Sequence, residues 1–225
     1  MCGRYVLGES SWAEYHDALS ILNPQQTKPR FNIAPTQSAP ICYASGDTLK
    51  STDARWWFVP SWHKGDVKDW KATTFNAKIE TASEKPTFRT AWRNNRCIVP
   101  ATGYYEWTGE KGKKQPWYIS VNQNVPVFFF AGLYSERSDG QFTYTILTRD
   151  AEAEIAQLHK RMPVILHSEQ LTPWLNNSVE DDQVIDKYGL GWGDRYQFRM
   201  VEPFGVRDDG PELMVSLRSP AHPIN

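Results

Sequence analysis

Short apolar runs, rich in β-branched and aromatic residues and bounded by Gly, Pro, Asn or Asp, recur along most of this sequence. Runs of this kind are typical of β-strands. The residues 111–114, Lys-Gly-Lys-Lys, are typical of a hairpin turn between two such strands. The pattern predicts strands at residues 4–7, 39–44, 48–58, 96–100, 104–107, 117–121, 125–134, 142–148 and 162–166.

Helical signals are fewer and lie mostly at the two ends of the sequence. Ser11 and Glu14 have the spacing of a capping box, which predicts a helix through about residue 22. The Pro- and Asn-rich residues 23–37 and the Trp-, Lys- and Asp-rich residues 60–76 are predicted loops. Asp150 and Ser168 are predicted caps of later helices. Helices are predicted at 79–94, 150–159, 168–175 and 179–188, with two strands after them.

The order of these elements indicates the fold class. Strands come in runs instead of alternating regularly with helices, which favours an α+β fold over a doubly wound parallel sheet. We therefore expect a mostly antiparallel, barrel-like central β-structure flanked by helices. No internal repeat, low-complexity tract or long linker is present, so residues 1–225 are predicted to form a single domain.

Composition excludes several classes of protein. Hydrophobic residues make up 40% and charged residues 23%, which is ordinary globular usage. The N-terminus lacks a basic segment followed by an apolar one, and no apolar run has membrane-spanning length. The three cysteines, Cys2, Cys42 and Cys97, fit neither a zinc pattern nor a disulfide framework. We expect a cytoplasmic protein without metal or organic cofactor.

Charge is unevenly distributed along a chain whose net charge is −1. Residues 50–120 hold 13 Lys and Arg against 7 Asp and Glu, whereas residues 150–225 hold 7 against 13. A basic segment on a neutral protein suits a local phosphate-binding face, although chance fluctuation would give the same pattern. The ten Trp, ten Tyr and ten Phe suit either a large core or stacking surfaces for bases.

Cys2 directly follows the initiator methionine, which aminopeptidases remove before a small side chain. The mature chain would then begin with an α-amine and a thiol on adjacent carbons. Their ordinary pKa values are about 8 and about 8.5, so each is partly nucleophilic at neutral pH. The amine can form an imine with an aldehyde, and the thiol can close onto the same carbon as a thiazolidine ring at high effective concentration.

Five ordered segments resemble the SOS-response-associated peptidase (SRAP) family of abasic-site processing proteins. The segments are MCGRY at the N-terminus, RFNIAPT at 30–36, NAKIET at 76–81, GYYEW at 103–107 with KQP at 114–116, and HKRMP at 159–163. The resemblance implies a protein that senses abasic sites in single-stranded DNA and forms a covalent DNA–protein crosslink through its mature N-terminal cysteine.

The resemblance also implies the catalytic residues. Cys2 would be the nucleophile, Asn76 would hold the amine or the opened sugar, Glu106 would transfer protons, and His159 would assist opening of the sugar ring. Ordinary structural roles also suit these residue types. A Glu on a strand can face solvent, Asn76 can be a turn residue, and His159 can complement a helix dipole.

Residues beside the motifs are the predicted DNA contacts. Four basic side chains would reach phosphates, and two tryptophans in the preceding loop would stack on or wedge beside bases: Arg4, Lys78, Arg89, Arg161, Trp62 and Trp70. The sequence departs from the family where Lys78 replaces a frequent Arg, where residues 56–62 lack a Gly, and where residues 63–74 form an enlarged loop.

Two other function classes stay open. The same residues would suit a peptidase or amidohydrolase with an N-terminal cysteine nucleophile, including self-removal of Met1. A non-covalent single-strand-binding module would use only the basic segment and the aromatics. Accompanying lyase activity at the abasic site is a further variant. We expect a monomer of bacterial or phage origin, associated with the nucleoid and not with a membrane.

Overall fold

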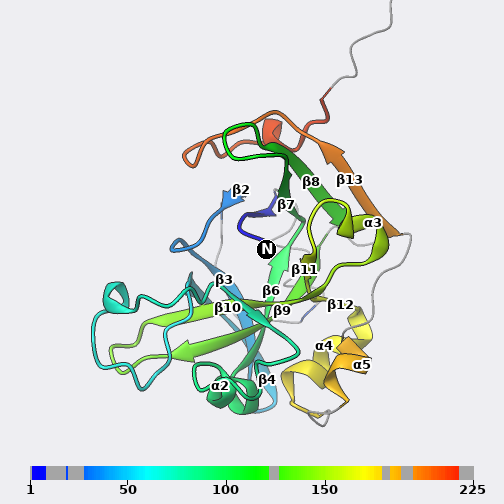
Figure 1. Ribbon diagram of the computed structural model, residues 1–225. Helices are drawn as coiled ribbons and strands as arrows, with labels where there is room; N and C mark the ends of the chain where they lie inside the picture. The colour runs from blue at the N-terminus through cyan, green and yellow to red at the C-terminus, as the bar shows by residue number, and fades with distance from the viewer. Residues whose placement is uncertain are drawn as a thin grey trace, which may run out of the picture.

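A computed structural model describes residues 2–8, 19, 28–121, 127–178, 183–188 and 195–217. Two β-sheets dominate this part of the chain, with short helices around them (Figure 1). The first sheet contains β1 (Tyr5–Leu7), β2 (Arg30–Ile33), β7 (Gly103–Thr108), β8 (Gln115–Val121) and β13 (Tyr196–Met200). Their order across the sheet is β13-β8-β7-β1-β2, and every pairing is antiparallel.

The second sheet closes a ring of hydrogen-bonded strands. β10 pairs with β9 along one edge and with β4 and β5 along the other, and β4, β3, β6 and β9 complete the ring. Only the pairings of β10 with β4 and β5 are parallel among the described strands. Its strands are β3 (Ser38–Ser45), β4 (Thr48–Trp56), β5 (Asn76–Lys78), β6 (Arg96–Ala101), β9 (Phe128–Glu136), β10 (Phe142–Asp150), β11 (Arg161–Pro163) and β12 (Ile165–Leu166).

Short helices pack beside the sheets. The predicted α+β class with a mostly antiparallel β-structure is confirmed. In the described part of the chain, no helix has both the length and the apolar character needed to cross a membrane. The helices are α2 (Arg89–Asn94), α3 (Ala153–Ala156), α4 (Ser168–Leu175) and α5 (Val184–Tyr188), with 3-10 turns η1 (Val67–Asp69) and η3 (Pro211–Met214).

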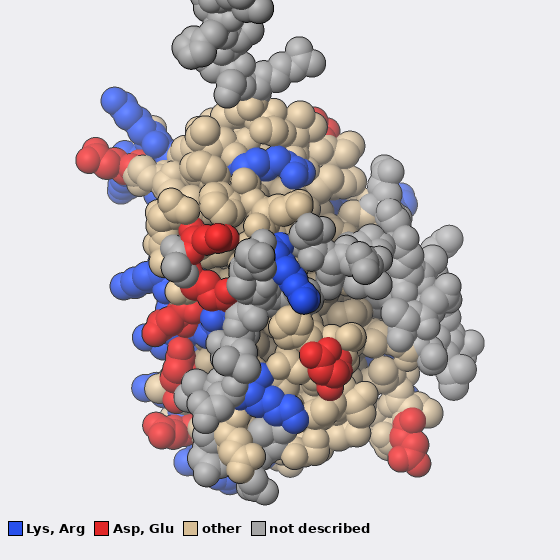
Figure 2. Space-filling model, turned by 90° about the vertical axis from the view of Figure 1, so that its right-hand side faces the viewer, with Lys and Arg blue, Asp and Glu red and all other residues tan. Residues whose placement is uncertain are grey.

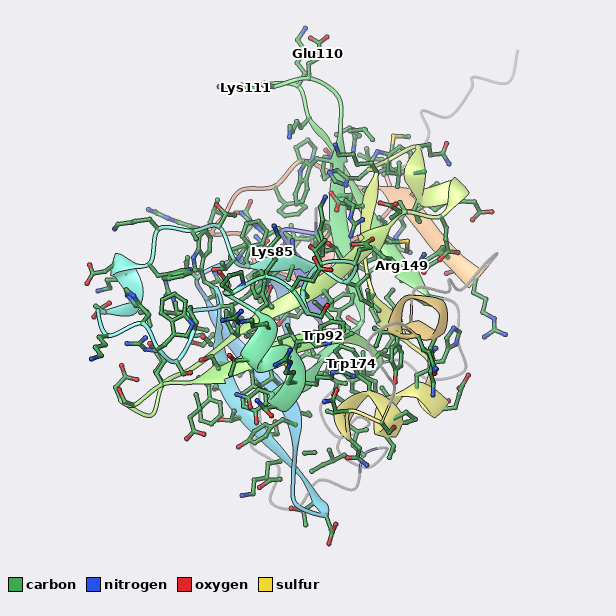
Figure 3. All side chains as sticks on the ribbon, turned by 60° about the horizontal axis from the view of Figure 1, so that its bottom comes forward. Lys85, Trp92, Glu110, Lys111, Arg149 and Trp174 are labelled. Atoms are coloured by element: carbon green, nitrogen blue, oxygen red, sulfur yellow. The ribbon has the colours of Figure 1, made fainter. Side chains whose placement is uncertain are left out.

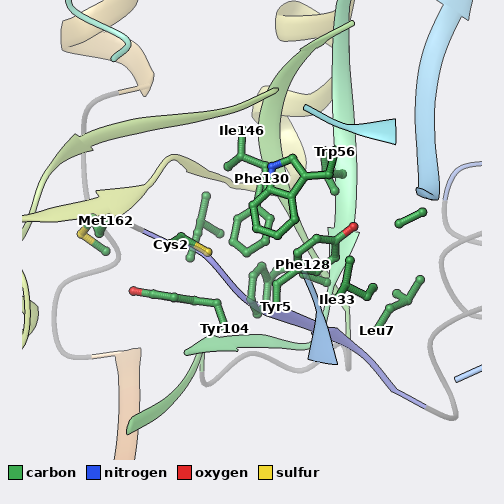
Figure 4. Close-up of a cluster of buried hydrophobic side chains, with 14 of the residues drawn as sticks. Cys2, Tyr5, Leu7, Ile33, Trp56, Tyr104, Phe128, Phe130, Ile146 and Met162 are labelled. Carbon is green, nitrogen blue, oxygen red and sulfur yellow. The ribbon is translucent and has the colours of Figure 1, made fainter. Parts of the chain in front are cut away.

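The main core lies between the two sheets. Side chains alternate across a strand, so Tyr5 and Leu7 of β1 face this core, whereas Val6 joins a smaller cluster on the other side of the first sheet. The same alternation along β7 sends Tyr104 into the main core and Tyr105 to the opposite cluster. Figure 4 shows the main core, with Cys2 among its aromatic and aliphatic side chains.

A second cluster covers the far side of the second sheet, beneath α2 and α4. Trp92 and Trp174 meet there edge to face, with ring centroids 5.8 Å apart (Figure 3). The buried Arg96 guanidinium lies between them, 4.8 Å from one ring centroid and 4.5 Å from the other. Such cation–π contacts allow a charged group to be buried against aromatic faces.

The loop predicted at residues 23–37 is wrong for Arg30–Ile33, which form β2 beside β1. The apolar pattern did not predict this strand because Asn32 is polar and the groups that bond its side chain are distant in sequence. Its Nδ2 donates to the carbonyl oxygens of Gly205 and Asp208, at 3.0 and 2.8 Å. These two bonds satisfy the Nδ2 donors of the buried amide, so the C-terminal segment offsets part of the cost of burying Asn32 in this strand.

Other boundaries also differ from the predictions. The predicted helix 79–94 is helical only from Arg89, because residues 79–88 form successive turns. Asp150 is not a helix cap: it ends β10, and α3 begins after Glu152. The second C-terminal strand is reduced to a single bridge between Val201 and Ser216. The predicted helix at 11–22 lies outside the described residues except for position 19, which is helical.

Two buried tyrosine hydroxyls test how this core is stabilised. Tyr144 and Tyr5 share a hydrogen bond of 2.8 Å, so Tyr144→Phe leaves a buried hydroxyl unpaired and should cost about 1–3 kcal/mol of unfolding free energy. Tyr104 is equally buried, but its hydroxyl has no partner among the described residues, so Tyr104→Phe should cost much less. Urea denaturation of both variants measures the difference. Equal losses would contradict this account of the pair.

Candidate active site at Cys2

Cys2 lies in the main core, three residues before the start of β1, and is fully buried. Its thiol is 3.6 Å from the carbonyl oxygen of Arg4, and its own carbonyl oxygen accepts a 2.7 Å hydrogen bond from Nδ2 of Asn76. Asn76 begins β5, where it is opposite Ile146 of β10. Sheet pairing therefore fixes the Asn76 amide, and the amide fixes the backbone of Cys2.

Glu106 is on the same face of β7 as Tyr104, two residues further along the strand, and is 3% exposed. Burial raises the pKa of Glu106 to about 7, although the charges of the chain's amino terminus and of Lys114 lower it in part. Burial, followed by the charge of Glu106, also raises the pKa of the Cys2 thiol. At neutral pH the thiol therefore keeps its proton, while Glu106 can both accept and release one.

His159 is in the turn between α3 and β11. Its Nδ1 is 3.0 Å from the backbone nitrogen of Arg161 and 3.0 Å from the carbonyl oxygen of the same residue. Burial lowers the pKa of His159, and the charges of the amino terminus, Lys160 and Lys114 lower it further. The lowered pKa favours the neutral imidazole at pH 7, and its Nδ1 lies within hydrogen-bond distance of both backbone groups of Arg161.

The charge of the amino terminus influences the pKa of three of the four predicted catalytic residues: Cys2, Glu106 and His159. The charge of Glu106 also contributes to the raised pKa of the Cys2 thiol, which links these two groups electrostatically. Asn76 joins them through its bond to Cys2. Cys2, Asn76, Glu106 and His159 come from four separate segments of the chain.

The predicted DNA contacts occupy different environments. Lys78 and Arg89 are exposed, and Arg4 is half-buried, with Nη1 donating to Gly3 at 2.8 Å. Trp62 is 55% exposed and lies edge to face with Trp70, at 5.6 Å between ring centroids. These five side chains keep the accessibility that a DNA contact needs.

Arg161 differs from the other predicted DNA contacts because it is buried and already paired. Its guanidinium donates to both carboxylate oxygens of Glu80, at 2.7 and 2.8 Å, to Asp150 at 2.6 Å and to the Thr148 carbonyl at 2.6 Å. Two carboxylates outweigh its single positive charge. The predicted phosphate contact of Arg161 would therefore have to form beside these carboxylates.

Sequence reasoning passed over two residues beside the site. Lys114 influences the pKa of both Glu106 and His159, so it lies near them although it belongs to the hairpin that joins β7 and β8. Glu110 and Lys111 mark the projecting tip of this hairpin in Figure 3. Tyr104 also contributes a hydroxyl whose pKa is influenced by Cys2 and Glu106. Tyr104 could have been identified from the sequence, because side chains two residues apart on a strand share a face and Tyr104 is two residues before Glu106.

Basic and acidic side chains are interspersed on the face shown in Figure 2. A broad field of one sign would attract polyanions from a distance, and this face does not present one. Attraction of an anion on this face would rest on individual lysines and arginines.

The raised pKa of Glu106 predicts a pH dependence of stability. Glu106 has an ordinary pKa of 4.5 and a folded value of about 7, so the folded state binds the extra proton between these limits. Unfolding free energy should therefore fall as pH rises from 4.5 to 7 and then level, by up to about 3 kcal/mol. Glu106→Gln should remove this fall in urea titrations at pH 5, 6, 7 and 8. An identical slope in the variant would refute the assignment.

Comparison with known proteins places the chain in a family. Residues 1–202 match the family model described as SOS response associated peptidase (SRAP). Abasic site processing protein YoqW of Bacillus subtilis is 34% identical over 96% of this chain and all of its own length, and YedK of Escherichia coli is 27% identical over 95% and 99%. A crystal structure of a Bacteroides thetaiotaomicron protein superposes with a TM-score of 0.83 at 23% identity, covering 96% of this chain and 100% of that one. The chain belongs to the SRAP family.

Proposed function

We propose that this protein captures the aldehyde of an abasic site in single-stranded DNA as a thiazolidine at Cys2. The observation that carries the proposal is the buried Cys2, held by Asn76 beside a Glu106 whose pKa is about 7. The relatives YoqW and YedK, which match almost all of this chain, bear the name abasic site processing protein. Family membership and site chemistry therefore support the same substrate class.

The first stage forms an imine. Removal of Met1 frees the α-amine of Cys2, whose nitrogen lone pair attacks C1 of the open-chain sugar. Glu106 accepts a proton from the attacking nitrogen and returns it to the carbinolamine hydroxyl, which leaves as water. Neutral His159, with its proton on Nε2, suits donation to the sugar ring oxygen as the ring opens.

The second stage closes the ring. The sulfur lone pair of Cys2 attacks the imine carbon, the C=N π pair returns to nitrogen, and the thiol proton is transferred through Glu106 to that nitrogen. No oxidant or reductant is needed. Because burial raises the pKa of the thiol, spontaneous thiolate is scarce, and a base such as Glu106 has to remove the proton. The thiol is already part of the imine, so closure has a high effective concentration.

Crosslinking is tested with processed protein and single-stranded DNA that contains one abasic site. Denaturing gels should show a heat-stable shifted band for the wild type and none for Cys2→Ala. Cys97→Ala is the matched control, because Cys97 is an equally buried cysteine without an α-amine, and its band should remain. Absence of the band with processed wild type would refute the proposal. Cys2-dependent peptide hydrolysis without a crosslink would instead favour the hydrolase.

The exposed basic residues should contribute affinity through phosphate contacts. Lys78→Ala and Arg89→Ala should each weaken binding of intact single strands and reduce the slope of log K against log salt by about 0.7. Lys50→Ala is the control, because this equally exposed lysine lies in the β3–β4 hairpin, outside all five site motifs. Fluorescence anisotropy at several salt concentrations gives the slopes. Equal slopes for all three variants would argue against these contacts.

A further inference from the structure

We propose that Arg137 is a positioning residue that holds an aromatic loop in place, so that rings of this loop stack against a nucleobase that flanks the abasic nucleotide. The aromatic loop is residues 60–72, and its three rings are Trp62, His63 and Trp70. The inference rests on the proposed function only for the choice of single-stranded DNA as the ligand. Its structural basis is a pair of hydrogen bonds from one buried guanidinium to the loop backbone.

The three rings form one cluster. Trp70 lies edge to face with Trp62, at 5.6 Å between ring centroids, and with His63, at 5.3 Å. Among the described tryptophans, Trp62 alone has more than half of its surface exposed, at 55%. An apolar ring left in water gains nothing from the hydrophobic effect, whereas a nucleobase has a π-face that can cover it. An exposed ring braced by the ring of Trp70 therefore suits a stacking surface.

Bonds inside the aromatic loop give it a compact shape. The Asp66 carboxylate accepts from the backbone nitrogen of Lys68 at 2.8 Å, and the Asp69 carboxylate accepts from that of Asp66 at 3.1 Å, which closes the turn η1. Gly65 leaves room for an imidazole, because a side chain at this position would begin 3.0 Å from Nε2 of His63. These contacts shape the loop, but they do not fix it to the rest of the protein.

Arg137 fixes the aromatic loop to the second sheet. It directly follows β9 and is 7% exposed, and its backbone nitrogen donates to the Gln141 carbonyl at 3.1 Å within the β9–β10 hairpin. Nη1 donates to the carbonyl oxygen of His63 at 3.0 Å, and Nη2 donates to that of Gly65 at 2.7 Å. Within the described part of the chain, residues 61–69 make no other hydrogen bond to a residue outside the loop. A planar guanidinium with two fixed donors sets both the position and the direction of the loop backbone, which a lysine ammonium does not.

The other end of the aromatic loop is attached to the candidate site. Nε1 of Trp70 donates to Thr74 Oγ1 at 3.1 Å, and that hydroxyl donates to the Phe58 carbonyl at 2.6 Å. Thr74 is buried two residues before Asn76, which begins β5 and bonds Cys2. Asn76 follows Trp70 by only six residues in the sequence, so their Cα atoms are at most about 20 Å apart. DNA held at Cys2 would therefore bring flanking bases within reach of the rings.

The order of the aromatic loop can be measured without DNA. Arg137→Lys keeps the positive charge but removes the planar fork, so the loop should open more often. Trypsin should then cleave the loop about 10-fold faster than in the wild type, while cleavage after the exposed Lys50 of the β3–β4 hairpin stays within about 2-fold. The trypsin sites in the loop are three exposed lysines, Lys64, Lys68 and Lys71.

The matched control is Arg207→Lys, which makes the same replacement at an exposed position of the C-terminal segment and should be cleaved as the wild type is. Equal cleavage of the loop in the wild type and in Arg137→Lys would overturn the positioning role.

Binding of DNA that has no aldehyde tests the stacking surface separately from crosslinking. The probe is a single strand whose central nucleotide carries a tetrahydrofuran in place of the abasic sugar. In a series of such strands, one flanking base at a time, up to about four nucleotides on either side, is replaced by the same group. For the wild type, loss of the base that contacts the rings should weaken binding about 10-fold. Arg137→Lys should weaken binding of the otherwise complete strand about 10-fold, but should add no further loss on the strand that lacks this base.

Three outcomes would overturn the role of Arg137. The first is an equal loss for Arg137→Lys on every strand, which would mean a general effect on folding, and the second is a wild type that is indifferent to every flanking base. With an aldehyde-bearing abasic site, Arg137→Lys should raise the DNA concentration for half-maximal crosslinking about 10-fold and leave the rate at saturation within about 2-fold. A lower rate at saturation with an unchanged half-maximal concentration is the third. A wild type that forms no crosslink would refute the proposed function, while binding of the tetrahydrofuran strands would still decide the role of Arg137.

Discussion

Pairing of β1 along both of its edges is the constraint on which the site depends. Chain termini usually fray because few contacts hold them. Here three residues, Tyr5–Leu7, lie between β2 and β7 and bury side chains on both faces of the sheet. Cys2, three residues before this strand, is also in the core, where the Asn76 amide donates to its carbonyl oxygen at 2.7 Å. A residue close to the N-terminus is thereby held in the core as an internal residue would be.

Burial of this terminus also determines the protonation states around it. Desolvation disfavours every charged form, so it raises the pKa of Cys2 and Glu106 and lowers that of His159. The groups around the nucleophile are therefore mostly neutral near pH 7, and Glu106 is the one whose proton is about equally bound and free. An imine forms and reverses by passing one proton between nitrogen and oxygen, which requires a group of this kind. Desolvation makes the Glu106 carboxylate costly to bury, and the same desolvation gives Glu106 the pKa of about 7 that suits proton exchange.

The sequence indicated most strands because their signals are local, whereas the four candidate site residues came from motifs that resemble a family. Alternation along 103–108 and the position of Cys2 can be read within a few residues. Strand β2 and the pairing of Arg161 could not be predicted in that way. Asn32 is bonded within its strand by carbonyls more than 170 residues away, and Arg161 pairs with Glu80, 81 residues upstream. A positive side chain in a motif indicates charge, but only the fold shows whether that charge is already neutralised.

The contacts that build the site are also the contacts that join the two sheets, and this limits how reactivity can be separated from stability. β1 and β7 belong to the first sheet, whereas β5 and the β10–β11 pair belong to the second. Cys2 and Glu106 come from the first group, and Asn76 and His159 from the second. The bond from Asn76 to Cys2 therefore crosses between sheets, so a shift of one sheet against the other would separate nucleophile from its supports. Substitutions at the edge of the core that preserve side-chain charge or size test the chemistry of the site. Truncations inside the core would shift both sheets, so their effects would report on packing.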